Sequence, residues 1–269
     1  MFRKTNLNDD SHVAFAKQFG ELDDVRPYVK AGRPNRLKHD ELFDVSNVEM
    51  DGSLLDPESP RGHANKGNGL FHVDSSFNPR RAGYSLLLAH ELPPPGAGPG
   101  GQTAFVDTRT AFDGLPVDIK ESLLKNDYVA AHSFRQSRKL ASPEFFADVN
   151  PLDHPMGRHK LVQRHEPSGR MNLYMAAHIH HIEGPNETES AELLRTLFTH
   201  ATQDRYVMEV QWQDPGDLVI WDNTCTMHRA VGGQFLRKYR RDMRRATVHD
   251  QSSYAWGLNE HTDQRQALP

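Results

Sequence analysis

Three candidate metal ligands, two of them close together and the third far along the chain, place the strongest constraint on its fold. His72 and Asp74 are two positions apart in a run that ends near Phe77, and His228 lies far downstream, after the short apolar run 217–222. A strand through the first run would turn both side chains to one face, and the apolar run is typical of a second, buried strand. Two imidazoles and one carboxylate are the donor set that holds Fe(II) in non-haem oxygenases, with open positions for substrate and O₂. These residues therefore predict an oxygenase in which a neighbouring strand supplies the third ligand.

An arginine-rich segment near the end of the chain indicates a site for organic anions. Residues 240–248 are predicted to form a strand, on which Arg241 and Arg245 share one face while Arg244 points to the other. Guanidinium groups bind carboxylates through paired hydrogen bonds, so one arginine suits the outer carboxylate of 2-oxoglutarate and the other suits an anionic substrate. The alternative is a solvated edge strand, on which charges discourage pairing with another sheet.

The pattern of apolar residues predicts an antiparallel β architecture with flanking helices. Continuous or alternating apolar runs predict strands at 84–89, 103–106 and 206–212. A turn at 214–217 follows the last of these, and it predicts a hairpin with the strand that leads to His228. Caps, a first-turn proline and apolar stripes predict helices at 9–19, 109–112, 116–124 and 189–201.

Several stretches of the chain resemble the taurine dioxygenase and 2,4-dichlorophenoxyacetate dioxygenase family of Fe(II)/2-oxoglutarate-dependent oxygenases. The likeness is closer to the second branch. The similar stretches occur in family order over most of residues 2–250, at 15–20, 44–48, 72–77, 100–103, 216–223 and in the arginine-rich strand. Their combination is specific even though each part is not. The resemblance implies a double-stranded β-helix of the jelly-roll type, mainly β with flanking helices.

The resemblance also implies which residues bind the metal and the cosubstrate. His72, Asp74 and His228 are expected to bind Fe(II). Thr103 and Arg241 are expected to hold the outer carboxylate of 2-oxoglutarate, whose other end binds the iron. The same pattern implies that O₂ is consumed at this site.

For the substrate, the resemblance points to Arg245, which falls where the family grips the acidic group of its substrate. Asn68 matches a position that contacts substrate, and Trp221 matches an aromatic residue beside the iron centre. The interval from His228 to Arg241 is slightly longer than the corresponding interval in taurine dioxygenase. Arg240 is therefore a competing candidate for the 2-oxoglutarate arginine.

A single oxygenase domain is expected over residues 1–250, followed by a polar carboxy-terminal tail at 251–269. Family members usually have several tens of residues ahead of the position that corresponds to Met1, and these residues supply early strands of the core. We therefore expect the family-typical amino-terminal strands to be missing, through a misassigned start, a trimmed chain or a shortened family member.

Composition argues against several classes of partner. The net charge of −4 gives no basic excess of the kind that binds nucleic acid, so a small metabolite is the expected partner, and the arginines at 241 and 245 favour an anionic one. No apolar run approaches the length of a membrane helix, and no membrane association is expected. Cys225 is the single cysteine, so no intrachain disulfide can form and a cytoplasmic location is expected. An upstream targeting segment and a homo-oligomer are both compatible with the sequence.

Taken with the residues, the resemblance implies an enzyme that hydroxylates a small carboxylate or sulfonate, including aryloxyacetate-like compounds, and releases succinate and CO₂. The alternative is a catalytically silent, amino-terminally shortened family member that acts as a binding or assembly subunit. A third hypothesis is a metalloenzyme that uses zinc as a Lewis acid and has no task for Thr103 and Arg241. The complete set of candidate residues favours the oxygenase.

Overall fold

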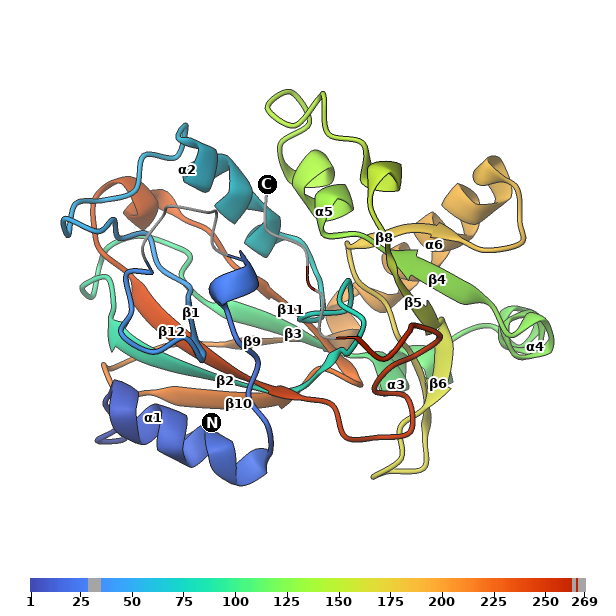
Figure 1. Ribbon diagram of the computed structural model, residues 1–269, viewed down its shortest axis with the longest axis horizontal. Coiled ribbons are helices and arrows are strands. Elements are labelled where there is room, and N and C mark those ends of the chain that lie inside the picture. Colours follow the sequence, from blue (N-terminus) through green and yellow to red (C-terminus); the bar gives the residue numbers. More distant parts are fainter. Residues whose placement is uncertain (29–34, 263–264, 266–269) are drawn as a thin grey trace.

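Two antiparallel β-sheets face each other at the centre of the computed structural model, which describes residues 1–28, 35–262 and 265 (Figure 1). The four-stranded sheet has the order β1 (Leu42–Asp44), β12 (Asp242–His249), β2 (Ala82–Glu91) and β10 (Leu218–Asp222). The three-stranded sheet has the order β11 (Thr226–Ala230), β3 (Thr103–Asp107) and β9 (Val207–Val210). All strand pairs in both sheets are antiparallel. This arrangement confirms the predicted mainly β fold with flanking helices.

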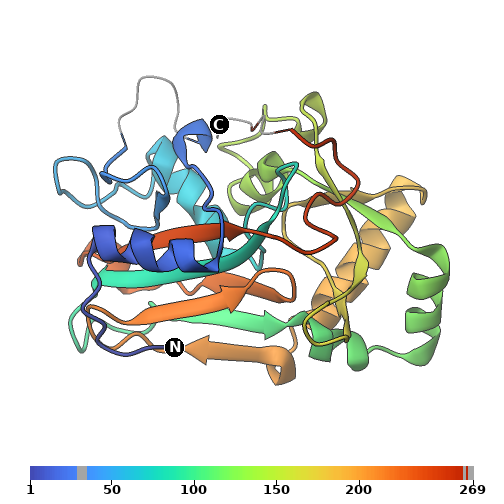
Figure 2. The same cartoon turned by 60° about the horizontal axis from the view of Figure 1, so that its bottom comes forward.

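Alternating side chains of β2 build a core on each side of the four-stranded sheet. Leu86 and Leu88 pack with residues of α1 (Asp9–Ala16), which lies along the outer face of the sheet in Figure 2. Leu87 and Ala89 instead pack with residues of the three-stranded sheet, in the core between the two sheets. Successive residues of a strand face opposite sides, so one continuous apolar run serves two cores.

The chain between β3 and β9 forms a helix-rich part beside the two sheets, coloured green to light orange in Figure 1. Its elements are α3 (Thr108–Asp113), α4 (Val117–Asn126), β4 (Val129–His132), α5 (Phe134–Ala141), β5 (Gly157–Lys160), β6 (Val162–Arg164), β7 (Met171–Leu173), β8 (Ile179–Ile182) and α6 (Glu187–Ala201). A large core of buried residues joins this part to β3 and β11. Between β1 and β2, the chain forms α2 (Pro60–Asn65) and a 3-10 helix, Lys66–Gly69.

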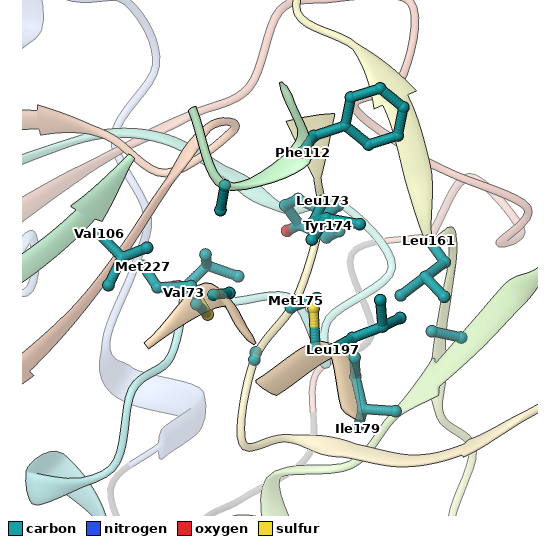
Figure 3. Close-up of a cluster of buried hydrophobic side chains, with 14 of the residues drawn as sticks. Val73, Val106, Phe112, Leu161, Leu173, Tyr174, Met175, Ile179, Leu197 and Met227 are labelled. Carbon is teal, nitrogen blue, oxygen red and sulfur yellow. The ribbon is translucent and has the colours of Figure 1, made fainter. Parts of the chain in front are cut away.

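This large core decides which way the candidate metal ligands point. Figure 3 shows Val73 and Met227 together in the core. Val73 lies between His72 and Asp74 in the sequence, and Met227 directly precedes His228. Neighbouring residues of extended backbone point to opposite sides, so burial of these two apolar residues turns the three ligands away from the core. The hydrophobic pattern therefore positions the polar site.

The sequence predicted a β-strand through His72 and Asp74, and this prediction is wrong, because no strand runs through residues 72–77. His72 makes only an isolated bridge with His228, and residues 74–77 form a turn in which Ser75 has a φ of 55°. The backbone N–H of Asp74 donates to the side-chain oxygen of Asn223 at 3.0 Å, and so it is not available to a partner strand. His72 and Asp74 still face one side, because two side chains that are two positions apart need extended backbone only over residues 72–74.

The predicted hairpin before His228 is also wrong. β9 pairs with β3, whereas β10 pairs with β2 in the other sheet. The turn between them is held by Asp217, whose buried carboxylate accepts hydrogen bonds from the backbone N–H groups of Gln213 and Asp214. Alternation of side chains identifies a half-buried strand, but it does not identify the sheet to which the strand belongs.

The predicted helices are present, and α1 begins after Asn8, whose side chain accepts a hydrogen bond from the N–H of Ser11. Within the described ranges, no helix has the length and apolar character needed to cross a lipid bilayer. After β12 the chain packs on the body, where the N–H of Leu258 donates to the carbonyl oxygen of Arg158 at 2.9 Å. The end of the tail, residues 263–264 and 266–269, lies outside the described residues.

Candidate active site

His72, Asp74 and His228 come together at one end of the space between the sheets. The backbones of His72 and His228 are joined by two hydrogen bonds of 3.0 and 2.8 Å, which place their side chains next to each other. Oδ1 of Asp74 lies 3.9 Å from Nε2 of His72 and 3.6 Å from Nε2 of His228. One ligand atom from each residue lies within 4.8 Å of the other two. All three side chains are buried, so the group is shielded from bulk water.

The protonation states of these residues suit a divalent cation. Burial lowers the pKa of His72 and, more strongly, that of His228, so both imidazoles are neutral at physiological pH. Burial by itself would raise the pKa of Asp74, but the charge of Arg245 brings it below the ordinary value, so the carboxyl group is ionised. Neutral imidazoles and an ionised carboxylate are the forms that bind metals. The donor set therefore fits Fe(II).

Hydrogen bonds from neighbouring groups orient these ligands. Nδ1 of His72 donates to the carbonyl oxygen of Leu70 at 2.7 Å, which leaves the lone pair of Nε2 free. Oδ2 of Asp74 accepts a hydrogen bond of 2.6 Å from the hydroxyl of Ser85, which leaves Oδ1 facing the imidazoles. The amide of Asn223 links the hydroxyl of Ser85 to the backbone of Asp74. Ser85 and Asn223 lie in stretches that the sequence marked only as a buried strand and a family motif.

Arg241 directly precedes β12 and is buried in a pocket that we call the Arg241 pocket. His72, His228, Thr103, Arg241, Trp221 and Arg245 line this pocket. Burial lowers the pKa of Arg241 to about 10. Its guanidinium makes one long contact, of 3.4 Å, with the carbonyl oxygen of Gly101, and its buried Nε has no acceptor among the described residues. An unpaired guanidinium beside the metal ligands fits the carboxylate of a bound acid.

Thr103 and Arg240 lie differently relative to that guanidinium. Thr103 lies on β3 in the same pocket, where its hydroxyl accepts a hydrogen bond of 3.0 Å from Nε1 of Trp212. Arg240 is exposed and its Nε lies 3.4 Å from a carboxylate oxygen of Glu91. Arg240 is not among the residues that line the pocket, so the geometry favours Arg241 over this competing candidate.

Arg245, Asn68 and Trp221 also surround the ligands. Nη1 of Arg245 lies 2.6 Å from Oδ1 of Asp74, and Nε donates to the hydroxyl of Thr247 at 3.2 Å. Asn68 is on the 3-10 helix after α2 and lines the space in front of His72. The ring of Trp221 lies 4.6 Å from that of His228, measured between centroids, and its Nε1 donates to Asn223. All the predicted site residues therefore lie around one centre.

A second pocket is also lined by His72, and it contains an arginine that sequence reasoning missed. We call it the Arg138 pocket, and its lining includes His72, Asp74, Asn68, Phe134, Arg138 and Arg245. Phe134 and Arg138 are four residues apart on α5, and the guanidinium carbon lies 3.9 Å from the centre of the ring. This i, i+4 spacing was the available signal, because it places both side chains on one helix face.

A second cluster of potential ligands contains His165, Asp222 and Cys225. Nε2 of His165 already makes a hydrogen bond of 3.0 Å with Asp222, and a guanidinium nitrogen of Arg109 lies 3.4 Å from its Nδ1. Burial raises the pKa of the Cys225 thiol to about 12, so it is not a thiolate at neutral pH. A positive neighbour and a protonated thiol argue against a second metal site.

Comparisons with known proteins place this site in a family. The chain matches the family described as "Taurine catabolism dioxygenase TauD, TfdA family" over residues 1–247. An alpha-ketoglutarate-dependent 2,4-dichlorophenoxyacetate dioxygenase of Burkholderia sp. (strain RASC) is 39% identical over 259 residues, which cover 92% of this chain and 80% of that protein. An (S)-phenoxypropionate/alpha-ketoglutarate-dioxygenase of Sphingobium herbicidovorans is 32% identical and covers 88% of this chain and 78% of that protein.

Solved structures show the same fold. The crystal structure of AAD-2 in complex with Mn(II) and N-oxalylglycine has a TM-score of 0.82 at 36% identity and covers 93% of this chain and 84% of that chain. A taurine dioxygenase from Burkholderia xenovorans has a TM-score of 0.67 at 24% identity, covers 93% of this chain and 75% of that chain, and so shows the fold alone. The predicted jelly roll is confirmed by this likeness. The chain belongs to the TauD/TfdA dioxygenase family and is an Fe(II)- and 2-oxoglutarate-dependent dioxygenase.

Proposed function

We propose that this chain hydroxylates a small carboxylate with an aromatic or similarly apolar body, of the aryloxyalkanoate type. The observation that carries the proposal is the Arg138 pocket, whose lining brings His72 and Asp74 together with two arginines and several aromatic residues. Relatives named for 2,4-dichlorophenoxyacetate and (S)-phenoxypropionate, both aromatic carboxylates, support this substrate class. Alkyl sulfonates are the second class to be tested.

In this proposal, His72, Asp74 and His228 hold Fe(II) on one face. When bound, Fe(II) with 2-oxoglutarate activates O₂, so that one oxygen atom enters a C–H bond of the substrate and the other enters succinate, with release of CO₂. Ser85 fixes the carboxylate of Asp74, and the carbonyl oxygen of Leu70 fixes the ring of His72. These hydrogen bonds limit the rotation of the ligands before the metal binds.

Arg241 and Thr103 orient the cosubstrate. The buried guanidinium of Arg241 would form paired hydrogen bonds with the outer carboxylate of 2-oxoglutarate, and the hydroxyl of Thr103 would donate a further one. The Nε1–H of Trp212 already occupies an acceptor position of that hydroxyl, so its proton points elsewhere and is free for the carboxylate. A cosubstrate held at its far end presents its keto acid group in one orientation.

Arg245 and Asn68 belong to the substrate side of the proposal. Both residues line the two pockets, and so they lie where substrate and cosubstrate meet. Arg245 draws the acidic group of the substrate towards the site, and the amide of Asn68 provides a hydrogen bond that does not depend on charge. Exclusion of water by the aromatic lining strengthens both interactions.

An anaerobic titration tests the metal and cosubstrate parts of the proposal. Fe(II) and 2-oxoglutarate are added to the purified protein, and the weak visible charge-transfer band of the chelated pair is recorded. We expect the band with the wild type and its loss in His228→Ala. The complete ligand set and the family membership argue against a silent binding subunit. Well-folded protein that does not form the band would instead support that alternative.

A substrate panel then tests the substrate class. Succinate release is measured with 2,4-dichlorophenoxyacetate, (S)-phenoxypropionate, a simple alkyl sulfonate and the neutral methyl ester of the first compound. We expect release above the background of uncoupled 2-oxoglutarate consumption with the aromatic carboxylates. Release with the sulfonate alone would move the chain to a different substrate class within the family.

The proposal includes a cytoplasmic location, which the single cysteine favours because the fold then needs no oxidising compartment. Fractionation of cells that produce the chain from its native gene tests this location. Recovery with the membrane or the periplasm would contradict it.

A further inference from the structure

Arg138 is a buried cation in the same pocket as His72 and Asp74, and the proposed function gives it no role. It lies on α5 and is 6% exposed. Its Nε is buried without a hydrogen-bond acceptor among the residues that the structure describes. Burial lowers the pKa of this guanidinium to about 9, so the group is still charged at neutral pH. An isolated buried charge is costly, so its presence calls for an explanation.

The other charged residues that line the Arg138 pocket have partners. Asp23 pairs with Arg265, Glu41 pairs with Lys17 at 2.8 Å, and Asp74 pairs with Arg245 at 2.6 Å. Within residues 1–28, 35–262 and 265, no carboxylate lies within ion-pair distance of Arg138. The nearby His72 and His178 are neutral, because burial lowers their pKa values, and they do not balance its charge. The pocket therefore has one unbalanced positive charge in its wall.

Arg81 shows what a structural buried arginine looks like in this protein. Arg81 is 2% exposed, and its Nε donates to the carboxylate of Asp250 at 2.7 Å. Its Nη1 donates to the side-chain oxygen of Gln163 at 2.6 Å. Removing one partner of a buried pair is strongly destabilising, so an arginine kept for the fold retains such partners. Among the residues that the structure describes, Arg138 has no such partners, although it is nearly as buried.

The guanidinium of Arg138 is nevertheless held in one place. It stacks on the ring of Phe134 at 3.9 Å. A Cβ added to Gly67 would lie only 2.2 Å from Nη1, so the missing side chain of Gly67 provides the space for the guanidinium. Gly67 also precedes Asn68, which faces the metal ligands. A rigid, unpaired fork beside a reactive centre has the properties of a binding group for an anion.

We propose that Arg138 binds the anionic group of the substrate and selects carboxylates or sulfonates whose apolar body packs against Phe77 and Phe134. This inference rests on the proposed function, because it assumes that the Arg138 pocket receives the substrate. Arg245 is already engaged by Asp74 and Thr247, whereas Nε of Arg138 has no acceptor among the described residues. The rings of Phe77 and Phe134 lie 5.1 Å apart, in contact, and form an apolar surface in the same pocket.

The test compares Arg138→Gln, Arg138→Lys and Arg135→Gln with the wild type. Arg135 is on the same helix but is not among the residues that line the pocket. Binding of 2,4-dichlorophenoxyacetate is measured anaerobically, from its perturbation of the charge-transfer band, and KM is measured from succinate release. We expect Arg138→Gln to raise Kd and KM about 100-fold, since a charged hydrogen-bond partner is lost from a buried site. We expect about a 10-fold rise in Arg138→Lys, which keeps the charge but loses the fork, and no change in Arg135→Gln.

A second pair of variants moves the guanidinium without removing its charge. Gly67→Ala is expected to displace Arg138 and to raise KM for the acid about 10-fold. Gly69→Ala is the matched control on the same 3-10 helix, because its added Cβ would meet nothing closer than the carbonyl oxygen of Ala230 at 3.9 Å. The KM for 2-oxoglutarate should stay unchanged in all of these variants.

Three outcomes separate this inference from the proposed function. If wild type binds the acid but Arg138→Gln binds it equally well, the role of Arg138 is refuted and the proposed function stands. If Arg138→Gln weakens the acid and its neutral methyl ester by the same factor, Arg138 only shapes the pocket and the inference is again overturned. If wild type forms the charge-transfer band yet binds neither 2,4-dichlorophenoxyacetate nor an alkyl sulfonate, the proposed substrate class is refuted. The role of Arg138 is then refuted as well, because it depends on that class.

Discussion

Arg81, next to the start of β2, is buried between Asp250 and Gln163, whereas Arg138 and Arg241 are buried beside the candidate metal ligands without a carboxylate partner among the described residues. All three guanidinium groups are almost fully enclosed. The difference is in what balances their charge. The chain itself neutralises the first arginine, and we expect organic anions to neutralise the other two.

This contrast separates charges that hold the fold from charges that bind ligands. Burial alone depresses the pKa of Arg138 to about 9 and that of Arg241 to about 10, and no carboxylate within the described part of the chain offsets either effect. Binding sites commonly retain such unfavourable groups, because the ligand recovers the energy that the empty site lacks. Removing Arg81 should therefore lower stability, whereas removing Arg138 or Arg241 should weaken ligand binding.

The largest effect should come from the metal ligands themselves. His228→Ala removes one of three donors, and we expect turnover of the best substrate in the panel to fall by at least about 1,000-fold. His165→Ala is the control, because His165 is a buried histidine that pairs with Asp222 away from the site. Succinate release is the measurement. Turnover that survives in His228→Ala would place the third ligand elsewhere.

Arg81→Met should weaken the fold itself. It leaves the carboxylate of Asp250 buried without its guanidinium, and we expect the free energy of unfolding to fall by about 3–5 kcal/mol. Arg138→Met, at a site where the described residues provide no ion pair, should leave that free energy unchanged or raise it. Urea unfolding of both variants measures the difference. Equal losses in the two variants would remove the distinction between the two regions.

Arg241→Ala should act on the cosubstrate. We expect the dissociation constant of 2-oxoglutarate to rise about 100-fold, because a buried charge-assisted pair is lost. The matched control is Arg240→Ala, which removes an exposed guanidinium from Glu91 and should change the constant by less than about 2-fold. The anaerobic charge-transfer titration reports both values. The reverse order of effects would make Arg240 the cosubstrate residue.

The smallest effect should be the acid sensitivity of a paired carboxylate. Burial by itself would raise the pKa of Asp242, but hydrogen bonds from Arg36 and Arg244 lower it from 3.8 to about 2. A pKa lowered by folding stabilises the protein above the unfolded value, and this contribution is lost as the pH falls from about 4 to 2. We expect a loss of about 2 kcal/mol over that range, measured by urea unfolding. Asp242→Asn should show a smaller decrease, and an equal decrease would assign the acid sensitivity to other groups.

Much of the candidate site could be predicted from short-range patterns. The two-residue spacing of His72 and Asp74 and the alternation that pairs Arg241 with Arg245 are local properties of extended backbone. The sheet partners of β9 and β10 could not be predicted, because alternation says which face of a strand is buried and not which strand lies beside it. The same limit explains why the segment after His72 is a turn, since the side chain of Asn223, far along the chain, takes the N–H of Asp74.

The sequence by itself determined the donor types, the strand-forming runs and the family resemblance, because residue identity and periodicity are properties of the chain. Only the tertiary structure decided which buried charges are paired. Arg81 meets Asp250 across 169 positions, while Arg138 lies against Gly67 and Phe134 with no carboxylate in reach among the described residues. Charge balance inside a protein depends on distance in space and on exclusion of water. For that reason the lack of a carboxylate partner for Arg138 among the described residues became visible only in the folded molecule.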